Sequence, residues 1–214
     1  MPGTPASPLG GPPREASGAG AGLPSDMLAT PVALVRELQA RIGIEAVALW
    51  CTDLLAARIP YDDPASPSLT WLSGGSAEYE LRKGHLAERG TDYWPRVWGA
   101  RGLLHGYEPK LAGTTVPVLV SALSDPHWRV REMTAKVIRT WDIGEAADAL
   151  TPLVSDEVTR VRVAACRAIE VVGEAEHADA LVSVLDDDER SVRNAARSGL
   201  DKMSSRLDRR LGPR

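Results

Sequence analysis

The sequence lacks the features that would place the protein outside the cytoplasm. It contains only two cysteines, Cys51 and Cys166, which lie far apart and inside apolar segments. Such cysteines are typical of small buried side chains in a reducing compartment, so we expect no disulfide framework. No apolar run is long enough to cross a membrane, and no basic start followed by an apolar core indicates a secretory signal. We therefore expect a cytoplasmic protein.

An excess of positive charge is also missing. The 214 residues have a formal net charge of −4, which gives the whole molecule no electrostatic reason to bind nucleic acid. The apolar share of 43% and the charged share of 25% are those of a globular protein. A chain of this length can form one sizeable domain and a tail.

Recognisable catalytic and metal-binding motifs are absent as well. The four histidines are scattered, and no two share a helix face at the spacing of metal ligands. The isolated pairs His85 with Glu88 and Glu174 with His177 are typical of surface contacts. Gly74-Gly75 lacks the strand and the lysine of a phosphate-binding loop, and no serine or cysteine lies in a nucleophile elbow. These absences predict no metal or cofactor and favour a protein that is not an enzyme.

What the sequence does contain is an internal repeat. Three copies of one unit follow each other from about Thr115 to Met203. Valine-arginine pairs, aspartates and leucines recur with a step of 31 residues: Val130-Arg131, Val161-Arg162 and Val192-Arg193; Asp125, Asp156 and Asp187; Leu119, Leu150 and Leu181. A fixed period of this length predicts a solenoid, in which each unit stacks on its neighbours to bury its apolar face.

Each unit is predicted to contain two helices joined by a short acidic turn. Apolar residues at helical spacing predict first helices over 116–123, 146–154 and 178–185, and second helices over 128–141, 159–172 and 190–203. Gly144 and Gly173 separate the units, since glycine suits a left-handed helix end. The units therefore span about 115–145, 146–176 and 177–204.

Two regions flank the repeats. Residues 1–25 are rich in proline, glycine and alanine, which predicts a disordered tail, and residues 205–214 predict a flexible C-terminal tail. Residues 26–91 predict a helical cap with helices over about 30–42, 45–58 and 77–89. A further helix over 92–105 contains Trp94-Pro95-Arg96-Val97, which echoes Trp128-Arg129-Val130 with the Arg-Val pairs 33 residues apart. Residues 92–114 therefore predict a divergent fourth unit.

The turn aspartate, the valine-arginine pair five to six residues later and the alanine-rich helix that follows resemble the HEAT repeat family. The resemblance is to the short bacterial form of this repeat, which is also found in phycobilisome-lyase-type repeats. The resemblance implies an all-α fold, a right-handed α-solenoid of antiparallel helix pairs whose second helices line the concave side. It implies no particular reaction, because repeats of this kind serve many functions.

Charge is distributed unevenly over the repeats. All 11 lysines and arginines between residues 115 and 204 fall in the second helices, where only Glu132, Glu170 and Asp201 oppose them. The turns and first helices contain the other acidic residues. One layer of the solenoid is therefore expected to be basic and the rest acidic.

Two sets of residues follow from this distribution. By the resemblance, one set forms a ladder between neighbouring units, in which the aspartates also cap the second helices; its members are Asp125, Arg131, Asp156, Arg162, Asp187 and Arg193. The other set is either a solvated helix face or a docking surface for an acidic partner; its members are Arg129, Lys136, Arg139, Arg160, Arg167, Trp128 and Trp141.

The function favoured by the sequence is a non-catalytic HEAT-repeat protein that mediates protein–protein interaction or scaffolding through its basic second-helix face. The partner is expected to be a protein with an acidic surface, and no membrane is involved. One alternative is a nucleic-acid binder or a HEAT-like DNA base-excision protein, in which Trp141-Asp142 beside Arg139 would supply the aromatic and catalytic residues. A second alternative is a lyase-accessory or chaperone-like repeat protein.

Overall fold

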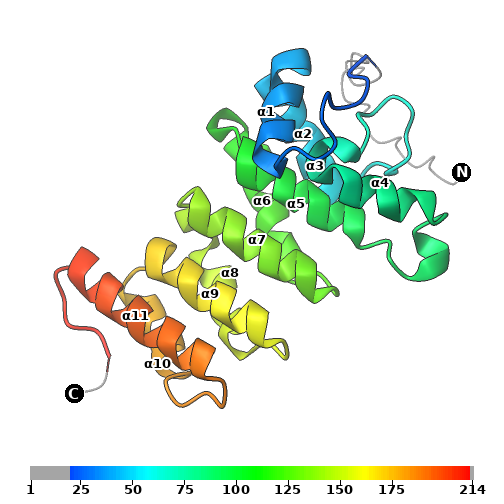
Figure 1. The fold of residues 1–214 in the computed structure, drawn as a ribbon. Helices are drawn as coiled ribbons and strands as arrows, with labels where there is room; N and C mark the ends of the chain where they lie inside the picture. Colours follow the sequence, from blue (N-terminus) through cyan, green and yellow to red (C-terminus); the bar gives the residue numbers. More distant parts are fainter. Residues whose placement is uncertain (1–19, 213–214) are drawn as a thin grey trace, which may run out of the picture.

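The structure is a computed structural model that describes residues 20–212, and the described chain is helical without a strand (Figure 1). The long helices have these bounds: α1 Pro31–Ile42, α2 Ile44–Leu55, α5 Trp94–Gly106, α6 Ala112–Ala122, α7 Trp128–Thr140, α9 Thr159–Val172 and α11 Arg190–Arg206. The shorter segments have these bounds: α3 Thr70–Ser73, α4 Gly75–Arg82, η1 Ala87–Arg89, η2 Pro109–Leu111, η3 Gly144–Ala146, α8 Ala147–Leu150, η4 Thr151–Ser155, η5 Ala175–His177 and α10 Ala178–Val182.

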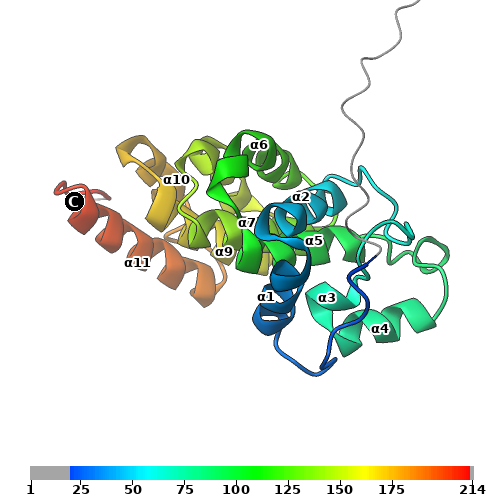
Figure 2. The same ribbon diagram turned by 90° about the horizontal axis from the view of Figure 1, so that it is seen from above.

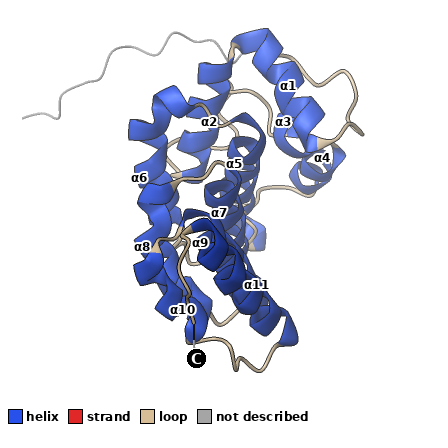
Figure 3. Cartoon of the chain, turned by 90° about the vertical axis from the view of Figure 1, so that its left-hand side faces the viewer, coloured by secondary structure: helices blue, strands red, loops and turns tan. Residues whose placement is uncertain are grey.

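The helices form two layers that run the length of the stack (Figure 3). One layer contains α2, α6, α8 and α10, and the other contains α5, α7, α9 and α11. Within the second layer each helix packs against the next, from α5 through α7 and α9 to α11. This arrangement confirms the predicted α-solenoid of helix pairs, while the hand of its superhelix stays a prediction. None of the described helices has the length and apolar character needed to cross a bilayer.

The second helices follow the sequence prediction closely, whereas two first helices are shorter than predicted. The segment expected to form one helix over 146–154 is divided among η3, α8 and η4. Pro152 lies at the start of η4 and has no N–H to continue the α-helical pattern, so the side chain of Thr151 donates to the carbonyl oxygen of Asp148 instead (2.9 Å). In the next unit α10 ends at Val182, where the hydroxyl of Ser183 donates to the carbonyl oxygen of Ala180 (2.8 Å).

The helix pair that precedes the repeats is formed by α2 and α5, although more than thirty residues separate them in the sequence. They approach closely because α5 has glycine where they meet. A Cβ at Gly99 would lie 2.7 Å from the carbonyl oxygen of Cys51, and one at Gly102 would lie 2.3 Å from its Sγ. The side chains of Thr52 in α2 and Thr115 in α6 are hydrogen-bonded (3.1 Å), so α2 also continues the first-helix layer.

The chain between α2 and α5 and the helix before α2 lie over the N-terminal end of the stack (Figure 2). Helix α1 packs on both α2 and α5, and α3 packs against α1 and α5. Trp71 in α3 is fully buried. The helix expected over 77–89 stops at Arg82, because Gly84 adopts a positive φ of 101° that ends the helical path.

Part of each predicted tail lies against helices within the described residues. Residues 1–19 lie outside them, but residues 20–25 lie against the cap: the indole N–H of Trp71 donates to the carbonyl oxygen of Gly22 (3.0 Å), and Arg41 donates to that of Ala21 (3.0 Å). At the other end α11 continues to Arg206. The backbone N–H of Leu211 then donates to Ser204 Oγ (3.0 Å), so the segment after α11 folds back on that helix.

Candidate partner-binding groove

Ion pairs join successive units of the stack. Arg131 Nε lies 2.7 Å from Asp156 Oδ2, and its Nη2 donates to Asp156 Oδ1 (3.0 Å). Arg162 contacts Asp187 at similar distances: its Nη2 donates to Oδ1 (3.1 Å), and its Nε lies 2.9 Å from Oδ2 as an ion-pair contact without hydrogen-bond geometry. Each arginine therefore binds the turn aspartate of the following unit with two nitrogen atoms.

The same arginines also hold the turn of their own unit. Nη1 of Arg131 donates to the carbonyl oxygen of Asp125 (2.9 Å), and Nη1 of Arg162 donates to that of Asp156 (3.0 Å). Within the described part of the chain, Arg193 in the last unit contacts only its own turn, at the carbonyl oxygens of Asp187 (2.6 Å) and Asp188 (2.9 Å). A guanidinium with donors on two edges thus fixes the turn at one edge and the next unit at the other.

A further pair extends these contacts to the helix pair before the repeats. Arg96 in α5 lies 2.7 Å from Asp125 through Nε and Oδ2, so it occupies the position of Arg131. The alignment of Arg96 with Arg129 at a step of 33 is therefore wrong, and the true step is 35. With a step of 35 residues, buried Pro95 also aligns with buried Val130, and buried Leu103 aligns with buried Ile138. The aligned residues are therefore those that pack against the neighbouring helices.

The aspartates lie two residues before the N-cap positions of the helices that they were expected to cap. Asp125 Oδ1 accepts from the N–H of His127, and Asp156 Oδ1 accepts from that of Val158, each over 2.8 Å. His127 and Val158 are themselves the N-cap residues of α7 and α9. The carboxylates therefore close the turn that leads into each helix and are not N-caps.

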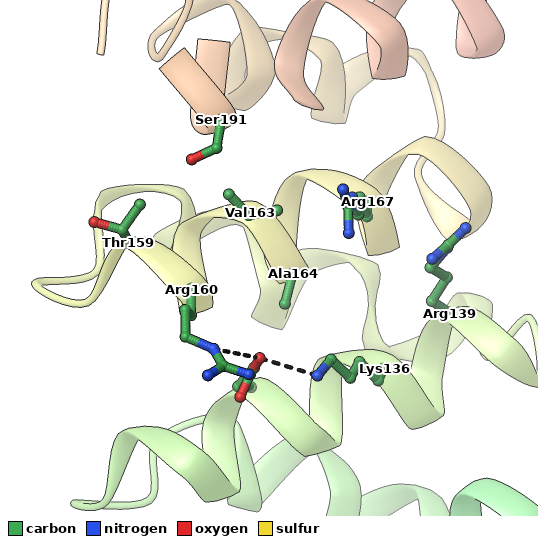
Figure 4. Close-up of a pocket in the computed structure, with 9 residues that line it drawn as sticks. Lys136, Arg139, Thr159, Arg160, Val163, Ala164, Arg167 and Ser191 are labelled. Atoms are coloured by element: carbon green, nitrogen blue, oxygen red, sulfur yellow. Dashed lines mark hydrogen bonds and ion pairs between the residues drawn. The ribbon is translucent and has the colours of Figure 1, made fainter. Parts of the chain in front are cut away.

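Four of the predicted partner-binding residues line one groove between α7 and α9, which also reaches the start of α11 (Figure 4). We call this cavity of about 370 Å³ the basic groove; its lining residues are Glu132, Lys136, Arg139, Thr159, Arg160, Val163, Ala164, Arg167 and Ser191. The two helices run side by side, and the small side chain of Ala164 leaves space between them. Lys136, Arg139, Arg160 and Arg167 together give the lining four positive charges against one negative charge.

The negative charge belongs to Glu132, which is only 7% exposed. Its Oε1 accepts from Lys136 Nζ (2.9 Å) and from Arg160 Nε (3.1 Å), as the dashed lines in Figure 4 show. Beyond the groove, Glu170 is similarly buried, 2.9 Å from Lys202 Nζ and 3.9 Å from Arg139. Buried carboxylates thus hold some basic side chains in place, and sequence reasoning counted them only as opposing charge.

Arg167 differs from the other basic side chains of the groove. It is exposed, and no carboxylate of the described residues lies within ion-pair distance of it. Arg160 also keeps free donors, since only its Nε has a hydrogen-bond partner in the described chain. The net positive charge of the groove is therefore available to a ligand at these two arginines.

The other three predicted partner-binding residues lie outside the groove lining. The Arg129 guanidinium stands 4.4 Å from the ring centre of Trp128 and 5.3 Å from that of Trp94. Arg160 lies on Trp128 as well, 5.5 Å from its ring centre. Trp128 and Arg129 thus form a stack of rings and guanidinium groups that ends at Arg160, on the rim of the groove.

Trp141 connects α7 to the end of α5. Its indole N–H points to the carbonyl oxygens of Leu103 (3.1 Å) and Leu104 (3.2 Å), and its ring lies against Tyr107. Asp142 follows in an exposed turn with a positive φ of 51° and does not line the basic groove. Trp141 and Asp142, the pair suggested for base excision, therefore do not line the basic groove.

The histidines have structural contacts. His177 is 6% exposed; its Nδ1 accepts from the N–H of Glu174 (2.9 Å), and its Nε2 lies 3.0 Å from Asp148 Oδ1 in the preceding unit. His127 stacks on Tyr93 with ring centres 3.4 Å apart, and burial is the main reason that its pKa is lowered. In the described part of the chain, no three His, Cys, Asp or Glu side chains are grouped as metal ligands would be.

The comparisons with known proteins agree with this geometry. The HEAT repeat model matches residues 116–201, which extend from α6 into α11 and include the three regular helix pairs. No curated protein matches the chain. Residues 116–201 of the chain are thus HEAT repeats.

Proposed function

We propose that this protein is a non-catalytic interaction module that binds an acidic segment of a protein partner in the basic groove. HEAT repeats commonly mediate protein–protein interaction, which supports the general role. The observation that supports the site is the convergence of Lys136, Arg139, Arg160 and Arg167 from two helices on one cavity. Clusters of arginine and lysine recognise acidic and phosphorylated motifs in many proteins.

Electrostatics favours a localised acidic partner over a long polyanion. The whole chain has a net charge of −4, so attraction of an anion has to be local, as at the groove, where four basic side chains face one carboxylate. A short acidic segment can enter the groove without approaching the acidic turns, whereas extended nucleic acid would also meet those turns. This contrast supports a protein ligand and makes nucleic acid the competing outcome of the test.

The test is capture of a partner from native lysate by the tagged protein, with and without nuclease, compared among three forms. The first form is the unchanged protein. The second is Arg167→Glu, which reverses a charge in the groove that no described carboxylate neutralises. The third is Arg197→Glu, a matched control with the same charge change at an exposed α11 residue outside the groove lining.

The proposal predicts a protein partner that survives nuclease, is captured by the unchanged protein and Arg197→Glu, and is lost with Arg167→Glu. We avoid reversing Lys136 or Arg160, because a carboxylate there would face buried Glu132 and disturb the fold. Equal capture by all three forms, with unchanged circular dichroism, would refute the groove as the binding site. A signal removed by nuclease would favour the nucleic-acid alternative.

A further inference from the structure

The guanidinium of Arg160 is held in a fixed position at one end of the basic groove. Its Nε donates to Glu132, and one face lies on the ring of Trp128. The side chain is nevertheless 63% exposed, and neither Nη atom has a partner in the described chain. An arginine held on two sides with its outer edge free is prepared to bind a carboxylate or phosphate with little further loss of entropy.

A second free arginine lies further along the same helix. Arg160, Val163, Ala164 and Arg167 follow the spacing that brings residues to one helix face, and all four line the groove (Figure 4). The seven-residue interval between the two arginines corresponds to about 10.5 Å along the axis of α9. Between them Val163 and Ala164 provide a short apolar floor.

The wall formed by α7 adds one basic residue at each end. Lys136 shares Glu132 with Arg160, and two of its three ammonium hydrogens are free for a ligand. Arg139 lines the groove beside Arg167, with its nearest carboxylate, that of Glu170, 3.9 Å away. The groove therefore offers two positive sites separated by an apolar floor.

This separation selects the conformation of a bound peptide. In a polyproline II segment, residues i and i+3 share a face and lie about 9.3 Å apart, close to the axial separation of about 10.5 Å between the two arginine positions on α9. In a β-strand the residues that share a face are about 6.8 or 13.6 Å apart, which is too short or too long. A helix would need acidic residues seven positions apart to match the same separation.

We propose that the basic groove recognises an extended segment of a partner protein in which two acidic side chains are three residues apart. One acidic group binds at Arg160 and Lys136, the other binds at Arg167 and Arg139, and small residues cross Val163 and Ala164. This inference rests on the proposed function and adds to it the spacing and conformation of the ligand.

The test measures binding of labelled peptides to the whole protein by fluorescence anisotropy at about 0.1 M salt, where surface charge interactions are still felt. Each peptide has two aspartates and otherwise only proline, alanine and serine, so that all have equal charge. The aspartates are placed one, two, three, four or seven residues apart. We expect the peptide with the three-residue spacing to bind at least about fivefold more tightly than the others, because only it reaches both sites.

Two variants check that the preference arises from the two arginines. Arg167→Gln should remove the preference and leave all peptides equally weak, whereas Arg197→Gln should keep it. Equal affinity at every spacing, with affinity lost in Arg167→Glu, would overturn the inference and leave the proposed function intact. Strongest binding at the seven-residue spacing, or no binding of any peptide at about 1 mM, would also overturn it. A single-stranded oligonucleotide that binds more tightly than every peptide would contradict both proposals.

Discussion

Removal of the Arg162 side chain should weaken the interface between the last two units and lower the stability of the whole stack. The side chain is only 14% exposed and its partner Asp187 only 11%. Arg162→Ala removes the two-nitrogen contact to the carboxylate and the bond to the carbonyl oxygen of Asp156. It also leaves the Asp187 carboxylate in a poorly hydrated position without its counter-ion.

The expected loss follows from these contacts. Hydrogen bonds to charged groups stabilise folded proteins by about 1.5–3 kcal/mol, and breaking a fully buried ion pair costs about 3–5 kcal/mol. Since both side chains keep some contact with water, we expect Arg162→Ala to lower the free energy of unfolding by about 2–3 kcal/mol. For a chain of this size such a loss lowers the melting temperature by about 4–12 °C.

The assay is urea unfolding followed by circular dichroism, applied as a double-mutant cycle with Asp187→Ala and with Arg197→Ala as the exposed control. The coupling energy between Arg162 and Asp187 should be at least about 1 kcal/mol, and the control should change stability by less than about 0.5 kcal/mol. An Arg162→Ala protein with an unchanged melting temperature, or a coupling energy near zero, would refute the reasoning.

Acidification gives an independent check on the same pair. Burial alone would raise the pKa of Asp187, but hydrogen bonds from Arg162 and from the N–H of Glu189 outweigh it and hold the pKa below its ordinary value. A carboxyl with a lowered folded-state pKa stabilises the protein above its unfolded pKa of about 3.9, and this contribution is lost as the pH falls through the folded pKa. The stability difference between the unchanged protein and Arg162→Ala should therefore be largest near neutral pH and shrink below about pH 4.

Three other predictions concern packing. Gly99→Ala should lower the free energy of unfolding by about 1–3 kcal/mol in urea titrations, because its Cβ would meet the backbone of α2; unchanged stability would contradict the close approach of α2 and α5. Cys51 and Cys166 should react with a thiol reagent only on unfolding, since both are buried and burial raises the pKa of each thiol, that of Cys166 to about 12; fast reaction of the native protein would show that one is accessible. Trp141→Phe should lower the free energy of unfolding by about 1 kcal/mol and leave peptide binding unchanged, because the indole N–H of Trp141 donates to a carbonyl oxygen of α5. Lost binding with intact stability would show that Trp141 belongs to the binding surface.

Sequence reasoning succeeded where the information is local and repeated. The second helices were predictable because Val130, Val161 and Val192 begin the same pattern of buried positions in each unit. It failed in the first helices, where one proline or serine changes the hydrogen bonding of a short segment. The register predicted for residues 92–114 from the tryptophans is wrong, whereas the ion pair of Arg96 with Asp125 shows the correct alignment.

The candidate groove was predictable only in part. The concentration of basic residues in the second helices drew attention to Lys136, Arg160 and Arg167, but nothing in the sequence shows which of them are neutralised. Glu132 lies on the same helix as Lys136, yet its contact with Arg160 crosses to the next helix. The space above Ala164 likewise exists only because α7 and α9 lie side by side.

By itself the sequence determined the repeat, the helix pairs and the layer in which the basic residues lie. These properties depend on spacing along the chain, since each unit must bury the same positions to stack on the next. Only the tertiary structure decided that α2 pairs with α5, that Arg131 and Arg162 bind the aspartates of the following units, and that no carboxylate of the described residues pairs with Arg167. Such contacts join residues far apart in the sequence, and packing selects them from many partners of the same charge.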